Sequence, residues 1–182
     1  MKINSLSVIS VVSVLAGTSV ASASVITDFY VGGMVGAGAQ TLLTKDHHKN
    51  SASRLVGAIA GVDIPAVRIE AEYNYLDSSE LSTNAAMLNV YAKMPSTIIL
   101  PYIGGGFGMV LGGDYTKDHV KYDIKKSTAY QAMLGATIDI FAVPIKFDVE
   151  GRVLYAPDVL NMNGTKPDML QYNARVKMRY IF

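Results

Sequence analysis

The 182-residue chain contains no cysteine and no tryptophan, and its 16 basic and 15 acidic side chains nearly cancel. The absence of cysteine excludes a disulfide-stapled scaffold, a zinc site with thiolate ligands and a lipid-modified N-terminal cysteine. The balance of charge argues against a nucleic-acid-binding protein, which would carry a basic excess on one face. Hydrophobic residues, in contrast, make up half of the chain.

Long apolar runs are also missing. The run "VISVVSVLAG" at 8–17 falls short of the ~20 residues that a spanning helix needs. It follows the positive charge of Lys2 and precedes the small residues Ala21 and Ala23, the pattern that signal peptidase recognises. We therefore predict that residues 1–23 are a signal peptide, cleaved after Ala23, and that residues 24–182 form the mature domain of an exported protein.

Strict alternation of apolar and polar residues dominates the rest of the chain. It is clearest in "VRIEAEYNYL" (67–76), "IKFDVEGRVLY" (145–155) and "QYNARVKMRYIF" (171–182), and a period of two predicts β-strands. Weaker alternation completes a set of eight predicted strands, with the others at 29–40, 55–64, 86–94, 101–111 and 129–140. Both faces of 55–64 are apolar or glycine, so its inward face stays open.

The connections between these segments alternate in length. Three are tight, and each contains a proline, namely Pro65, Pro95 or Pro144. The other four are long and polar: 44–53, 77–83, 113–127 and 156–169. Short turns at one end and long loops at the other are typical of an up-and-down antiparallel barrel.

Two kinds of barrel have eight strands, a soluble lipocalin-like cup and an outer-membrane barrel. A soluble barrel would have to place the many aromatic side chains inside a lumen that is only wide enough for ordinary side chains. Facing outward instead, they form two belts, with Tyr75, Tyr130, Tyr155 and Tyr172 at one end and Phe29, Phe147, Tyr180 and Phe182 at the other. We therefore predict an all-β fold, an eight-stranded antiparallel transmembrane β-barrel with both termini in the periplasm.

This assignment turns twelve charged side chains toward the lumen. Seven are basic and five acidic: Arg68, Glu70, Glu72, Lys93, Asp139, Lys146, Asp148, Glu150, Arg152, Arg175, Lys177 and Arg179. Paired carboxylates can perform acid–base catalysis. A structural network of ion pairs is the alternative, and we favour it because eight strands leave no room for a substrate. Asp148 or Glu150 is expected to pair with Arg175 or Lys177 on the neighbouring strand.

The order of motifs along the chain resembles the OmpA-like, opacity-protein family of outer-membrane β-barrels. The matching stretches are "FYVGGMVG" (29–36), "VRIEAEYNY" (67–75), "PYIGGGFG" (101–108), "AYQAMLGATIDI" (129–140) and the ending "VKMRYIF" (176–182). The ending is similar to the C-terminal signal that the outer-membrane assembly machinery recognises, carried here by Val176, Met178, Tyr180 and Phe182. The resemblance implies a bacterial outer-membrane location, with lipid or lipopolysaccharide, periplasmic chaperones and the assembly machinery as partners.

The glycines of "PYIGGGFGMV" do not form a dinucleotide-binding loop. Counting from Gly104, the sixth position of the G-x-G-x-x-G pattern is Met109, and no helical pattern follows. The stretch instead matches "YVGGMVG" (30–36) on the opposite side of the predicted barrel. We interpret these glycines as interior positions that give room to the charged side chains, at Gly32, Gly36, Gly104, Gly106 and Gly108.

Other candidate sites are weak. His47 and His48 share one loop and His119 lies in another, so no converging metal ligands are indicated. Ser127, His119 and Asp123 could form a hydrolase or acyltransferase site at the rim, but no motif supports it. We predict no catalytic residue, metal or cofactor. The expected role is a surface-exposed structural or adhesion-type protein that contacts host surface or matrix molecules through loops 113–127 and 156–169, with a low-conductance channel as the alternative.

Overall fold

The computed structural model describes residues 27–44, 47–78, 81–96, 98–117, 120–124, 126–140, 143–159 and 167–182. The predicted signal peptide therefore lies outside the described residues. The described part contains nine strands: β1 (Asp28–Thr44), β2 (His47–Asp63), β3 (Val67–Ser78), β4 (Leu81–Lys93), β5 (Ile99–Lys117), β6 (Val120–Ile124), β7 (Ser127–Asp139), β8 (Ile145–Ala156) and β9 (Asp168–Ile181).

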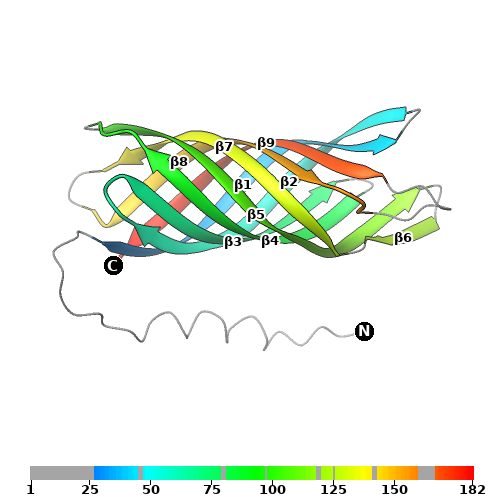
Figure 1. Cartoon of the computed structure of the whole chain (residues 1–182), viewed down its shortest axis with the longest axis horizontal. Coiled ribbons are helices and arrows are strands. Elements are labelled where there is room, and N and C mark those ends of the chain that lie inside the picture. Colours follow the sequence, from blue (N-terminus) through cyan, green and yellow to red (C-terminus); the bar gives the residue numbers. More distant parts are fainter. Residues whose placement is uncertain are drawn as a thin grey trace.

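All strand pairs are antiparallel, and the sheet closes on itself. Strands that follow one another along the chain pair with each other, except that β6 and β7 both pair with β5. The pairing of β1 with β9 closes the cylinder. Figure 1 shows the strands wrapping obliquely around the long axis, with the C-terminus at the end that holds the short turns. A closed cylinder leaves no unpaired sheet edge along the barrel wall.

The barrel wall is eight strands wide, because β6 and β7 lie end to end along β5 and together form one strand of the wall. Gly113 of β5 pairs with Ile124 of β6, and Val110 pairs with Ser127 of β7, so the same register runs across the break. The predicted eight-stranded antiparallel barrel is confirmed.

The outer surface is apolar, as expected of a membrane barrel, and charged side chains are buried in the interior together with apolar clusters. The predicted aromatic residues face outward, and the exposed set is Phe29, Tyr75, Tyr130, Tyr155, Tyr172, Tyr180 and Phe182, with Phe147 partly exposed. Aliphatic side chains such as Val35, Leu134 and Val149 cover the wall between them. The inward face of β2, which the sequence left open, is the one that carries Leu55, Ile59 and Asp63, because these residues are buried while Val56 is exposed.

Three of the predicted long loops are mostly strand. β1 and β2 are separated by two residues, β3 ends at Ser78 with β4 beginning at Leu81, and β5 and β6 continue the ladder to Lys117 and from Val120. The predicted loops 44–53, 77–83 and 113–127 are thus largely hairpins that extend the barrel wall. The apolar–polar alternation stops there because both faces of a sheet can be polar outside the apolar band, although backbone pairing continues.

Candidate functional site

The lumen holds a network of buried ions, and it is the candidate functional site. Five bases and five acids among the described residues are buried: Arg68, Arg152, Arg175, Lys177 and Arg179 with Asp63, Glu70, Glu72, Asp148 and Glu150. Three further residues predicted to face inward lie at the short-turn end, where they are partly exposed: Lys93, Asp139 and Lys146. Lys146 and Asp139 form an ion pair of 3.3 Å there.

The lowest layer of the network is centred on Asp148. Arg179 donates from Nε and Nη2 to its two carboxylate oxygens at 2.7 and 3.0 Å, and Arg68 donates from Nη1 at 3.2 to 3.3 Å. Arg179 also reaches Asp63 at 3.0 Å, and Lys93 pairs with the same carboxylate. Two arginines therefore neutralise and orient one carboxylate, Arg179 from the adjacent strand β9 and Arg68 from β3.

The middle layer joins two carboxylates through one lysine. Lys177 Nζ lies 2.8 Å from Glu70 Oε1 and 3.1 Å from Glu150 Oε2. Arg175 donates from Nε to Glu150 at 2.5 Å. Tyrosine hydroxyls complete the layer, because Tyr30 and Tyr91 donate to Glu70 and Tyr102 to Glu150, all at 2.8 to 2.9 Å.

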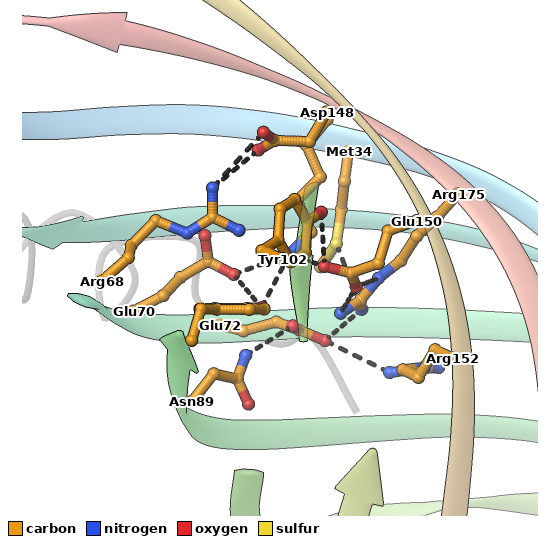
Figure 2. A network of polar contacts seen from close by, with 12 residues as sticks. Met34, Arg68, Glu70, Glu72, Asn89, Tyr102, Asp148, Glu150, Arg152 and Arg175 are labelled. Atoms are coloured by element: carbon orange, nitrogen blue, oxygen red, sulfur yellow. Dashed lines mark hydrogen bonds and ion pairs between the residues drawn. The ribbon is translucent and has the colours of Figure 1, made fainter. Parts of the chain in front are cut away.

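The upper layer, meaning the one nearest the long hairpins, is centred on Glu72 and is drawn in the lower half of Figure 2. Its Oε1 accepts from Arg175 at 2.7 Å and from Arg152 at 3.2 Å. Asn74 and Asn89 donate to the two oxygens of the same carboxylate at 2.7 and 2.9 Å. Four donors surround this one buried acid, three of them on Oε1 and one on Oε2. A carboxylate paired so fully with fixed donors fits a structural role better than catalysis.

Two tyrosine rings account for the unpaired nitrogens of Arg68. Its Nε and Nη2 have no hydrogen-bond partner, but its guanidinium carbon lies 4.1 Å from the ring centre of Tyr91 and 4.6 Å from that of Tyr102. The two rings meet edge to face at 5.3 Å. A guanidinium packed on aromatic faces is stabilised by their electrons, so these nitrogens do not mark an anion site.

The interior glycines provide the space that the large side chains fill. A Cβ built on Gly104 would lie 2.4 Å from Cδ1 of Tyr91, and one on Gly106 would lie 2.0 Å from Oδ1 of Asn89. The other predicted positions are equally tight, with an added Cβ meeting backbone or side-chain atoms at 2.1 to 2.7 Å at Gly32, Gly36 and Gly108. The geometry fits the interpretation that absent side chains make room for the network.

An apolar cluster covers the polar network at the end of the long hairpins. It contains Leu81, Ala85, Met87, Val110, Ile124, Ala129, Leu154, Ala156, Val159 and Met169, all buried. Leu154 lies two residues beyond Arg152 on β8, so the cluster follows directly on the upper layer. Beyond the upper layer the lumen thus contains this apolar cluster, with the buried amides of Gln40 and Gln171 at the same level.

Of the three rim residues considered in the sequence, only Ser127 has a described side chain. Ser127 donates its hydroxyl to the carbonyl of Pro157, and His119 lies outside the described residues. No group of three or more His, Asp or Glu residues suited to a metal ion occurs in the part of the chain that the structure describes. No helix within the described ranges is long and apolar enough to cross a membrane.

Sequence reasoning missed several members of the network, Asp63 and Tyr91 among them. Asp63 was not singled out because the alternation of 55–64 is ambiguous. Tyr91 lies two residues before Lys93 in the same strand and therefore on the same face, so the predicted inward position of Lys93 also predicts an inward Tyr91. Both are buried and hydrogen-bonded to charged partners.

No family model and no curated protein matches the chain in sequence. Among solved structures it is similar to Neisserial surface protein A, with a TM-score of 0.61, 14% identity, and coverage of 82% of this chain and 95% of that one. The N-terminal β-barrel domain of Pseudomonas aeruginosa OprF gives a TM-score of 0.52 and 11% identity over 83% of this chain and 97% of that one.

A third similar structure is Ail, the attachment invasion locus protein of Yersinia pestis, solved with the heparin analogue sucrose octasulfate. It gives a TM-score of 0.50 and 7% identity over 84% of this chain and 99% of that one. At such identities the similarity concerns the fold. The chain has the fold of the small eight-stranded outer-membrane barrels, and the predicted OmpA-like, opacity-type resemblance is confirmed at that level.

Proposed function

We propose that the protein is a small surface-exposed barrel of the bacterial outer membrane that acts through its outer end, in a structural or adhesion-type role, and neither conducts nor catalyses. The observation that carries this proposal is the filled lumen. A buried ion network and an apolar cluster follow one another inside the wall. With the interior occupied, the surfaces left for function are the lipid-facing wall and the hairpins beyond it.

Export through the signal peptide 1–23 and insertion by the outer-membrane assembly machinery belong to the same proposal. The apolar outer wall with aromatic residues near both ends supports the membrane location. Fractionation of cells that express the full chain is the direct test. The mature protein should begin at Ser24 and appear in the outer-membrane fraction, and a soluble periplasmic product would refute the proposal.

A low-conductance channel is the competing function, and planar bilayers separate the two. Refolded protein should give no current steps above those of the empty bilayer, because the apolar cluster excludes water and ions. Discrete steps that respond to charge reversal at Arg152 or Arg175 would show that the network rearranges to admit ions. That outcome would replace the closed-barrel proposal by a channel.

The adhesion-type role is tested on the hairpin β5–β6 and on the β8–β9 connection. Since Gly113 pairs with Ile124, replacing 114–123 by a two-residue turn shortens the hairpin at a paired position. Deleting 160–166 shortens the other connection. We expect either change to reduce binding of cells to immobilised matrix proteins while the heat-modifiable folding of the barrel survives. Undiminished binding without both segments would contradict an adhesion role for these loops.

A further inference from the structure

The outer wall of the barrel carries an apolar groove of about 900 Å³ across β7, β8, β9 and β1. Its floor is formed by Gly151, Ala174 and Ala37, and larger side chains border it, namely Leu134, Val153 and Tyr172. All six side chains face outward. The groove therefore lies on the face that the proposed function assigns to lipid.

The groove follows one row of paired residues. Leu134 pairs with Gly151, Gly151 with Ala174, and Ala174 with Ala37. The next residue in the row is Arg54, which pairs with Ala37 and is exposed on the same outer face. The row thus runs from an aliphatic side chain in the wall to a cation near the end of the long hairpins.

The backbone around Gly151, in the floor of the groove, does not require glycine at this position. A Cβ on Gly151 would meet only the carbonyl oxygen of Leu134, at an ordinary 3.8 Å. The interior glycines, in contrast, leave no space for a Cβ. Gly151 therefore leaves the floor of the groove free of a side chain at a position where the backbone would accept one.

Arg54 supplies a charge for an anionic headgroup. No ion pair between described residues involves it, although Asp77 faces it across the β2–β3 ladder. An arginine fork binds phosphate oxygens in a bidentate way. Arg54 and Tyr172 would then serve different parts of one amphiphilic ligand, the first its anionic head and the second its apolar chain.

The dimensions match one leaflet of a membrane. Four steps between strands separate Arg54 from Leu134, which is ~19 Å at ~4.8 Å each. Because strands in such barrels tilt by ~40°, the row descends by ~12 Å over that length. One leaflet contributes ~15 Å of hydrocarbon. A row that begins with Arg54 at the membrane surface therefore ends within the same leaflet.

We propose that this groove is a binding site for one phosphorylated lipid of the outer leaflet, with an acyl chain over Gly151 and the phosphate on Arg54. This inference rests on the proposed outer-membrane location. A second copy of the chain is a poorer occupant, because its apolar outer wall would leave the charge of Arg54 without a partner.

The test uses the full-length barrel, refolded in detergent, freed of lipid and titrated with lipid A, with native mass spectrometry to count retained lipid. Gly151→Leu fills the floor without a backbone clash and should weaken retention about tenfold. Gly33→Leu is the matched control, since Gly33 also faces outward with an open Cβ position, 3.8 Å from the nearest atom, but lies outside the groove. This control should retain lipid A as the native protein does.

The headgroup contact is tested with Arg54→Gln and dephosphorylated lipid A. The native barrel should prefer the phosphorylated form, Arg54→Gln should lose that preference, and Asp77→Asn should keep or strengthen it. Equal retention by Gly151→Leu and the native protein would overturn the proposal, as would equal loss in Gly33→Leu. A change of oligomeric state in Gly151→Leu with lipid retention unaltered would assign the groove to a second copy instead. Failure to insert into bilayers at all would refute the proposed membrane location, which is a separate result.

Discussion

At the scale of single residues, stability depends on how completely each buried charge is paired. Glu72 is surrounded by two guanidinium groups and two amides, and Glu150 by Arg175, Lys177 and the Tyr102 hydroxyl. Breaking one partner of such a set costs more than the pair itself contributes, because the remaining charges stay buried.

Glu72→Gln should therefore destabilise the barrel strongly. The change keeps the size of the side chain but leaves Arg152 and Arg175 without a shared counter-ion, and we expect a loss of about 3 to 5 kcal/mol. The urea midpoint of the protein in detergent micelles measures it. Asp77→Asn removes an exposed acid and should leave the free energy of unfolding within about 0.5 kcal/mol of the native value. Equal midpoints for both variants would show that the network is not stabilising.

Gly104→Ala and Gly105→Ala compare the two faces of one strand at adjacent residues. A methyl group at 104 would meet the Tyr91 ring, whereas at 105 the nearest atom is 3.9 Å away. We expect Gly104→Ala to cost about 1 to 3 kcal/mol through displacement of Tyr91 from Arg68. Gly105→Ala should be neutral or slightly stabilising because it restricts the unfolded chain. The thermal unfolding midpoints of the two variants in detergent micelles measure this difference. A similar loss of stability in both variants would contradict the packing explanation.

At the scale of strands, the sequence predicts the segments that cross the apolar band of the membrane but not the strand segments that lie outside it. Alternation identified β3, β8 and β9 and the inward parity of their charges because lipid and lumen demand opposite side chains. It missed β6 and the ends of β1 and β5, since a ladder in water needs no apolar face. Nor could it orient β2, where small and apolar residues occupy both faces, so the buried Asp63 went unnoticed.

The C-terminal strand gives a prediction that separates assembly from stability. Phe182 is 74% exposed, touches Tyr180 edge to face, and its backbone nitrogen donates to Phe29. Phe182→Ala keeps that hydrogen bond and removes no buried contact, so the refolded protein should unfold like the native one. In cells, loss of the terminal aromatic residue should reduce the folded, heat-modifiable form in the outer membrane. Normal cellular assembly of Phe182→Ala would contradict the predicted assembly signal.

At the scale of the whole molecule, two different groups of buried side chains fill the lumen along the barrel axis. The ion network occupies the lumen from the short-turn end up to Arg152, and the apolar cluster around Leu154 and Met87 follows. The charges of the first section were predictable from strand parity. The second section was not, because it combines side chains from β4, β5, β6, β7, β8 and β9 that meet only once the register is fixed.

Two barriers in series predict that opening one leaves the barrel closed. Arg152→Ala removes a side chain that contacts Glu72, Gln131 and Asn173, and so widens the polar section. Leu154 and its apolar neighbours remain in place, and a constriction lined in part by apolar side chains opposes the entry of hydrated ions. Planar-bilayer recordings of Arg152→Ala should therefore show no current steps, like those of the native protein. Steps in the variant alone would mean that the ion network is the only barrier and that the apolar cluster is permeable.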